Sequence, residues 1–342
     1  MKSETDIAFS LLRGALDGTA VSIGKLETSQ WWSLFRLLQK NHVAALASEA
    51  FALLPQEEKP SREILIPWLS ERQKAEGWHR YQFEVQQDII ATMANHGIET
   101  LVLKGTHTAQ YYPIPELREF GDLDLYFYNR HNEADRVAAE VLKVNVSNDA
   151  HHHSKYDYRG VTVESHYDFV NTHYPPSNRH YEAMLKTLAP SPSFEVLFLL
   201  RHMACHFAAS RLTLRELVDW TLTCNALQSQ VDWEQVQRTV DDYGMTAFTW
   251  ALCQLGEKYL GRHIPLTITA DNDYSRDIKH DIVYGSTKDH ADNGPSRLIW
   301  KLRRWHTLRW KRRLVFNDPP TQLLLSGITS HAMKPQSILH KQ

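Results

Sequence analysis

The spacing of apolar residues changes twice along the chain, and these changes limit the folds it can adopt. Up to about residue 95, apolar residues recur every three or four positions, which is typical of amphipathic helices. Further along they gather into short runs, which are typical of buried strands, and the helical spacing then returns at Ser193. The sequence therefore predicts an α+β fold, in which a small mixed β-sheet is flanked by helical regions. The predicted regions are an N-terminal helical region (1–95), an α/β core (96–175) and a C-terminal helical region (176–342).

Two helices are expected before the core, and further helices after it. The first carries a single apolar stripe and begins at a cap formed by Thr28-Ser29, and the second runs from Ile66 to Asn95 and ends before Gly97. After the core, Ser193 is the expected N-cap of the helix FEVLFLLRHMACHF. The segments RLTLRELVDWTLTCNAL and WEQVQRTVDDYGMTAFTWALCQLGEKYL predict further helices. The residues of the first stripe are Trp32, Phe35, Leu38, His42, Ala45 and Leu46.

Within the core, the pattern predicts the order strand, helix, strand, helix, strand, strand. The last two strands are joined through Arg159-Gly160, a short connection that is typical of a β-hairpin. The expected strands cover 98–103, 123–127, 151–158 and 161–170, and the expected helices are the turn HTAQYY and 131–143.

Composition points to an ordinary globular chain of 342 residues with a formal net charge of −2 at pH 7, so no global charge draws it to nucleic acid or to a membrane. Cys205, Cys224 and Cys253 are isolated in apolar segments, which indicates free thiols in a reducing compartment. The N-terminal segment lacks a signal-peptide pattern, and no apolar run approaches the roughly 20 residues of a membrane span. We therefore expect a cytoplasmic protein without a membrane span.

The sequence Asp122-Leu123-Asp124 enters a predicted strand. Alternate side chains of a strand share a face, so the two aspartates lie together, and Glu164 shares a face with His166 on a later strand. If the two strands are neighbours, Glu164 completes a cluster of three carboxylates. Like charges this close need a cation, and oxygen ligands suit Mg²⁺ or Mn²⁺. The simpler alternative is a solvated acidic edge strand.

Upstream of the aspartates, Lys104-Gly105-Thr106 closes an apolar strand and opens a helical turn. Glycine lets a backbone approach phosphate closely, and the amides at the start of a turn bind it. Lys104 and Arg118 are the cations expected to pair with phosphate oxygens. The alternative is a surface lysine beside an ordinary turn.

These residues together resemble the nucleotidyltransferases of the polymerase β-like superfamily. The signature is an apolar strand ending at glycine, then two acidic residues that alternate with apolar ones, then a later third acidic residue. The segments LVLKGTHTAQYYPIPELREFGDLDLYF and VTVESHYDF are similar to a bacterial family of uncharacterised nucleotidyltransferases. The resemblance is sharp over 98–170 and looser over 193–222.

The resemblance implies a role for each matching residue. Gly105 and Thr106 would contact the triphosphate, and Asp122 and Asp124 would hold the metal. Glu164 would be the third carboxylate, which holds a second metal or receives the proton of the attacking hydroxyl. Gly121 and His166 would lie beside this cluster. The activity implied is transfer of a nucleoside monophosphate from an NTP to a hydroxyl-bearing acceptor with Mg²⁺ or Mn²⁺, and the acceptor is left open.

Two other functions compete with this hypothesis. One is a nucleotide-binding or regulatory protein that keeps the fold without turnover. The other is a nucleic-acid-binding protein that uses the basic, tryptophan-rich segment 297–313, for which a packed amphipathic helix with a solvated basic face is favoured instead. His202 and His206 have a spacing that suits a metal, although packed helix histidines are favoured. The triplet His151-His152-His153 is expected to split between the two faces of a strand.

Overall fold

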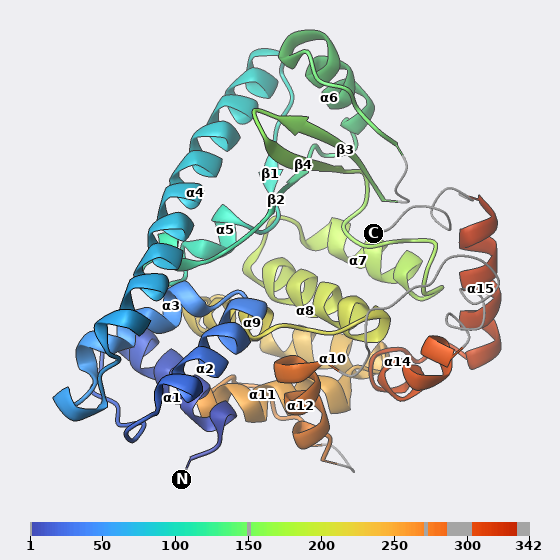
Figure 1. Cartoon of the computed structure of the whole chain (residues 1–342). Coiled ribbons are helices and arrows are strands. Elements are labelled where there is room, and N and C mark those ends of the chain that lie inside the picture. Colours follow the sequence, from blue (N-terminus) through green and yellow to red (C-terminus); the bar gives the residue numbers. More distant parts are fainter. Residues whose placement is uncertain (1, 149–151, 270–272, 286–302, 334–342) are drawn as a thin grey trace. The chain divides into compact units, whose positions relative to one another are not determined.

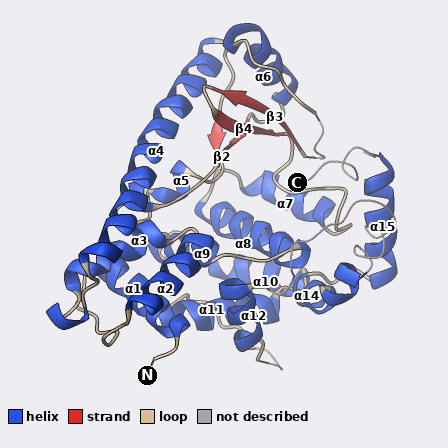
Figure 2. Ribbon diagram, in the orientation of Figure 1, coloured by secondary structure: helices blue, strands red, loops and turns tan. Residues whose placement is uncertain are grey.

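The structure is a computed structural model that describes residues 2–148, 152–269, 273–285 and 303–333. Helices make up most of the described chain, and its strands form one small sheet (Figure 2), so the predicted α+β class is confirmed. The chain divides into two compact units. One consists of Met1–Ala75 with Leu199–Asn317, and the other of Glu76–Phe198 with Asp318–Gln342.

The second unit holds a four-stranded sheet with the order β1-β2-β4-β3. Strands β2 and β4 are parallel, and the other two pairs are antiparallel. The predicted order of elements is confirmed, but the first strand is shorter than expected and the last ends at His166. The strands are β1 Leu101–Val102, β2 Asp122–Tyr126, β3 His153–Tyr158 and β4 Val161–His166.

One face of this sheet is apolar because the alternate residues of β2 and β4 that point to it are leucine and valine. Helix α4 (Arg62–Asn95) covers this face through Val85, Ile89 and Met93, and α6 (His131–Val137) packs against the same cluster (Figure 1). The expected helix 131–143 is confirmed, although a π-helical turn, Ala138–Leu142, ends it. The buried strand residues of the cluster are Leu123, Leu125, Tyr156, Val161 and Val163.

The hairpin of β3 and β4 turns at Arg159 and Gly160, as predicted. Both residues have a left-handed backbone, with φ of 53° and 74°, which is the conformation of a two-residue turn matched to the twist of paired strands. The amide of Gly160 donates to Asp157 Oδ1 at 2.9 Å. This turn fixes which residues of β3 and β4 lie opposite each other.

Further helices complete the sheet unit, which includes only the start of α8, up to Phe198. The turn expected as HTAQYY is the four-residue α5 (Thr106–Ala109). Helix α8 (Pro192–Ala209) begins one residue before the expected cap at Ser193, and the Phe194 amide donates to Ser191 Oγ at 3.2 Å. Ser193 is therefore not the cap, because Ser191 takes that role. The remaining elements of the unit are the 3₁₀ turn Pro115–Leu117, α7 (Asn178–Leu188) and α15 (Pro320–Met333).

In the helical unit, the expected stripe belongs to two helices rather than one. Helix α2 ends at Lys40, since His42 has a left-handed backbone with φ 54°, and α3 then starts at Ala44. The cap is a box formed by Glu27 with Gln30 and not Thr28-Ser29, because the glutamate side chain accepts from the helix. The helices are α1 Glu4–Asp17, α2 Thr28–Lys40, α3 Ala44–Ser48, the 3₁₀ turns Glu49–Leu53 and Gln56–Glu58, α9 Leu214–Ala226, α10 Trp233–Asp242, α11 Thr246–Leu260, α12 Ser275–Tyr284 and α14 Arg309–Val315.

The basic segment proposed for nucleic-acid contact is described only from residue 303, and its first residues, 297–302, lie outside the described chain. Leu308 is buried as expected. The basic side is not wholly solvated, however, because Lys311 is fully buried and its Nζ lies 2.6 Å from Asp281 Oδ1. A lysine held in this way is not available to phosphates, which weakens the nucleic-acid alternative.

Among the described residues, no helix combines the length and the apolar character that crossing a lipid bilayer requires.

The buried face of the sheet predicts a large loss of stability when it is truncated. Leu125 is fully buried in the apolar cluster, so Leu125→Ala should lower the free energy of unfolding by about 2–5 kcal/mol. Leu325, on α15 of the same unit, is 61% exposed, and Leu325→Ala should change it by less than about 0.5 kcal/mol. Urea denaturation of both variants compares them. Equal midpoints would show that Leu125 is not part of a packed core.

Candidate active site at the carboxylate face of the sheet

The opposite face of the sheet carries the acidic residues. In the parallel pair, Asp124 lies directly beside Glu164, and Asp122 lies beside Thr162. The two strands are therefore neighbours, which is the condition under which Glu164 joins the two aspartates. Asp124 is 2% exposed and Glu164 is 8% exposed, so two carboxylates are held side by side away from bulk water.

Asp124 is held by two cationic side chains. Lys104 Nζ lies 3.0 Å from Asp124 Oδ1, and His166 Nε2 lies 3.1 Å from the same oxygen. Lys104 reaches this position because the preceding amide, Leu103 N, donates to the Asp124 carbonyl at 2.9 Å and continues the β1–β2 ladder. The lysine is therefore fixed by the sheet itself, two residues beyond the end of β1.

Glu164 has its own set of partners. Lys155 Nζ lies 2.6 Å from Glu164 Oε1, and His153 Nε2 lies 3.5 Å from it. His166 Nε2 lies 3.6 Å from the other oxygen, Oε2. His166 thus stands between the two carboxylates and contacts both.

The charges of the cluster differ from residue to residue. Burial and the neighbouring Asp124 raise the pKa of Asp122 above its usual value. Burial opposes ionisation of Asp124 too, but Lys104 and His166 hold the pKa of Asp124 below its usual value. Although burial acts to lower the pKa of Lys104, Asp124 and Asp122 raise it. Asp122 is therefore the carboxylate whose ionised form a bound cation would stabilise most.

His166 is the charged imidazole of the group. Its burial opposes protonation, yet hydrogen bonds to Asp124 and Glu164 raise its pKa to about 9. Its Nδ1 lies 3.3 Å from the Asp168 carbonyl oxygen, so both ring nitrogens face oxygens and both act as donors. Burial lowers the pKa of His153 to about 4, so this neighbour stays neutral.

The glycine of the phosphate-binding prediction has an unusual backbone. Gly105 has φ 69° and ψ −118°, a region that other residues rarely enter. A side chain at Gly105 would meet Phe120 at 3.5 Å, an ordinary contact, so the backbone and not lack of space requires glycine here. The neighbouring Thr106 hydroxyl donates to Gln86 Oε1 on α4. This contact ties the turn to the long helix.

Two other residues that the sequence predicts for the site, Arg118 and Gly121, flank Phe120, which packs against this turn. Arg118 is 4% exposed, and its guanidinium lies 5.6 Å from the centre of the Phe120 ring, which itself faces Gly105. Gly121 is exposed, and its carbonyl oxygen accepts from Gln82 Nε2 at 2.9 Å. The structure thus gathers Lys104, the carboxylates and His166 into one cluster, with Arg118 packed in the wall next to Phe120.

A comparison with protein families matches residues 27–261 to the family described as uncharacterised nucleotidyltransferases. The match covers the carboxylate cluster, the whole sheet and most of the helices. The chain belongs to this family. No curated protein and no solved structure matches it.

The sheet also brings in residues that the sequence interpretation missed. Lys155 lies opposite Glu164, and His153 lies opposite His166. The sequence could have predicted these pairs, because a two-residue turn at Arg159-Gly160 places Tyr158 opposite Val161 and so sets the register of the whole hairpin. Of the histidine triplet, His151 lies outside the described residues, whereas His152 and His153 each offer a nitrogen within 4.8 Å of one on His166.

The donor set suits a hard divalent cation. Asp124, Glu164 and His166 each offer a ligand atom, all within 4.8 Å of one another. The two carboxylates supply the hard oxygen donors that an ion such as Mg²⁺ prefers, and His166 lies between them. Asp122, whose pKa is raised, adds a further oxygen donor on the same strand face.

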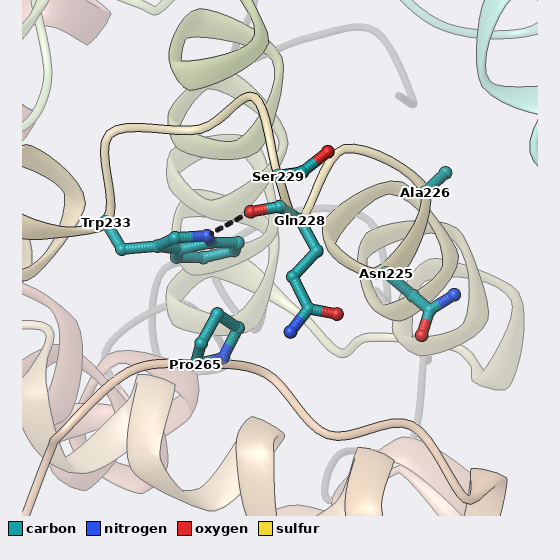
Figure 3. A pocket seen from close by; sticks show the side chains of 6 residues that line it. All are labelled: Asn225, Ala226, Gln228, Ser229, Trp233 and Pro265. Atoms are coloured by element: carbon teal, nitrogen blue, oxygen red, sulfur yellow. Dashed lines mark hydrogen bonds between the residues drawn. The ribbon is translucent and has the colours of Figure 1, made fainter.

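A separate hollow lies in the helical unit (Figure 3). The indole Nε1 of Trp233 donates to the Gln228 carbonyl oxygen at 2.8 Å at its wall. None of its lining side chains is ionisable at neutral pH, so it offers no carboxylate, histidine or lysine for acid–base chemistry. Its lining residues are Asn225, Ala226, Gln228, Ser229, Trp233 and Pro265.

The backbone of Gly105 predicts opposite outcomes for two glycine substitutions. Gly105→Ala should lower the free energy of unfolding by about 1–3 kcal/mol, because alanine must adopt a glycine conformation. Gly77 lies inside α4 with open space around it, and Gly77→Ala should raise the free energy by about 0.5–1 kcal/mol. Urea denaturation measures both. If both substitutions stabilise the protein, the assigned turn conformation is wrong.

Proposed function

We propose that this chain is a metal-dependent nucleotidyltransferase of the polymerase β-like superfamily that moves a nucleoside monophosphate from an NTP to a hydroxyl-bearing acceptor. Membership of the family supports this proposal. The observation that carries it is the in-register parallel pairing of Asp124 with Glu164, with Asp122 on the same strand face and Lys104 at hydrogen-bond distance. We also propose that the protein is bacterial and cytoplasmic, as the sequence predicts.

Asp122 and Asp124 would hold a divalent ion, Mg²⁺ or Mn²⁺. When bound, such an ion supplies charge neutralisation at the triphosphate and lowers the pKa of the acceptor hydroxyl. The chain's own contribution is to present oxygens on a rigid strand and to keep water from Asp124, which is 2% exposed. The positive φ of Gly105 turns the backbone beside the carboxylates, where a triphosphate would lie close to the Thr106 amide.

Lys104 and Lys155 would change partners when nucleotide binds. In the structure they neutralise Asp124 and Glu164, at 3.0 Å and 2.6 Å. If Asp124 and Glu164 held a cation, the ammonium groups of Lys104 and Lys155 would be free to pair with phosphate oxygens. Both lysines would then stabilise the charge that develops on the leaving pyrophosphate.

Transfer joins the acceptor oxygen to the α-phosphorus and breaks the bond from that phosphorus to the pyrophosphate oxygen. The acceptor hydroxyl must lose its proton. Glu164 is the candidate to receive it, since it lies beside Asp124. In the structure, His166, His153 and Lys155 hold the pKa of Glu164 low against the effect of burial, which keeps it ionised but makes it a weak base. Release of Lys155 toward phosphate would make this carboxylate more basic.

A second candidate is nucleotide binding without transfer. The observation that favours it is the close pairing of Glu164 with Lys155 and His153, which occupies the residue that would accept the proton. Under this alternative an NTP binds with metal, but no acceptor releases pyrophosphate from it.

Neutralising the aspartate pair tests the proposal directly. The double variant Asp122→Asn, Asp124→Asn should lose metal-dependent NTP binding and reduce any pyrophosphate release at least about 100-fold, because the ion loses two charged ligands. Calorimetry with the four common NTPs and Mg²⁺ or Mn²⁺ measures binding. A phosphate-release assay with added pyrophosphatase measures turnover across an acceptor panel.

The matched control removes two exposed acids from the same unit. Glu133 and Glu140 are 49% and 62% exposed, and they pair with Arg130, at the N-cap of α6, and with Arg136 of α6. The variant Glu133→Gln, Glu140→Gln should bind NTP as the wild type does. NTP binding that survives in the aspartate variant, or that fails equally in both variants, would rule out the carboxylate site. Binding without turnover for every acceptor would support the second candidate.

Lys104 distinguishes a phosphate ligand from a purely structural cation. Lys104→Met should weaken NTP binding roughly 10-fold to 100-fold through loss of a charge-assisted hydrogen bond. The same variant should bind Mn²⁺ alone more tightly, since a competing ammonium has left Asp124. Titration calorimetry measures both affinities, with the exposed Lys143→Met as control. Unchanged NTP affinity would confine Lys104 to a structural role.

A further inference from the structure

Helix α8 presents two histidines one turn apart within the helical unit. His202 and His206 are four residues apart, so their side chains lie on one face of the helix. Their ring centres are 4.2 Å apart with planes at 41°. Each ring offers a nitrogen that lies within 4.8 Å of the ligand atoms of its neighbours.

A carboxylate from the next helix meets this pair. Glu216 lies in the first turn of α9, where its Oε2 accepts from the Thr213 amide at 2.8 Å and from the Thr213 hydroxyl at 3.1 Å. This capping box fixes the side chain. The other oxygen, Oε1, lies 3.1 Å from His206 Nδ1. Glu216 thus uses one oxygen for its helix and turns the second toward the histidines.

We propose that His202, His206 and Glu216 form a binding site for a transition-metal ion such as Zn²⁺. Each residue offers a ligand atom, and these atoms lie within 4.8 Å of one another. The 3.1 Å between Glu216 Oε1 and His206 Nδ1 suits two ligands that share one ion at about 2.0–2.2 Å each. Two imidazoles and one carboxylate favour zinc-like ions over Mg²⁺.

The surroundings of the three residues fit an ion that keeps an open position. The side chain of His206 is 52% exposed, whereas that of Glu216 is 11% exposed. Three protein ligands with solvent access leave room for water or another ligand as the fourth. Arg215 is a nearby positive charge that opposes a cation, but its Nε lies 4.0 Å from Asp219 Oδ2, which offsets that charge.

This site does not rest on the proposed function, because none of its residues belongs to the carboxylate cluster. The test is titration of the full chain with Zn²⁺ by calorimetry and with Co²⁺ by visible absorption. His206→Ala removes an exposed ligand. Glu216→Gln removes the charge and retains an oxygen for the capping box, so the start of α9 is preserved. Circular dichroism verifies that both variants are folded.

The matched control is another histidine–glutamate pair of the same unit. His263 Nδ1 lies 3.7 Å from Glu257 Oε1, both side chains are mostly exposed, and the pair belongs to no described metal-ligand group. The expected result is that His206→Ala and Glu216→Gln each lose one equivalent of Zn²⁺, or bind it at least about 100-fold more weakly, and lose a Co²⁺ absorption band. His263→Ala should match the wild type.

Two results would overturn the site. The first is an unchanged Zn²⁺ stoichiometry and Co²⁺ spectrum in both ligand variants. The second is an equal loss in His263→Ala, which would mean adventitious binding at surface histidines. Because the variant Asp122→Asn, Asp124→Asn leaves all three ligands in place, it should keep this equivalent of Zn²⁺, whatever its effect on NTP.

Discussion

The parallel pairing of β2 with β4 places Asp124 directly beside Glu164, and this one register determines the rest of the sheet unit. Two buried carboxylates at neighbouring positions repel each other, so the fold must supply positive charge on the same face. Lys104, Lys155 and His166 supply it, each from a different segment. The register therefore requires these three cationic side chains, because without them the paired carboxylates would repel each other.

The same register also provides the core. Because side chains alternate along a strand, placing the acids on one face forces Leu123 and Val163 onto the other, where α4 and α6 cover them. The apolar face therefore stabilises a sheet whose polar face is electrostatically unfavourable. A shift of one residue in β2 would bury the aspartates against α4. Burying unpaired charges is unfavourable, so the observed register is favoured over the shifted one.

Only part of the carboxylate face could be predicted from the sequence. The alternation around Asp122 and Glu164 predicts which side of its strand each side chain occupies. It does not predict that the two strands are neighbours, because that depends on long-range pairing. The pairing of β3 with β4 is local, and the turn at Arg159-Gly160 implies that Lys155 lies opposite Glu164. The predicted helix caps are wrong for another reason. Thr28 and Ser193 have suitable hydroxyls, but the residues that lie at the cap positions are Glu27 and Ser191.

The proposed nucleotide site and the proposed zinc-like site would select ions by different means. At the sheet, His166 lies between two buried carboxylates, and its hydrogen bonds to them raise its pKa to about 9, so in the absence of a metal the imidazole is a cation. On α8, the ligand atoms of His202 and His206 lie within 4.8 Å of those of one carboxylate, Glu216, which also accepts hydrogen bonds at a helix cap. The first site therefore offers mainly carboxylate oxygens, which suit Mg²⁺, whereas the second offers two imidazole nitrogens, which suit zinc-like ions. The ratio of carboxylates to histidines at each site thus determines which ion it would select.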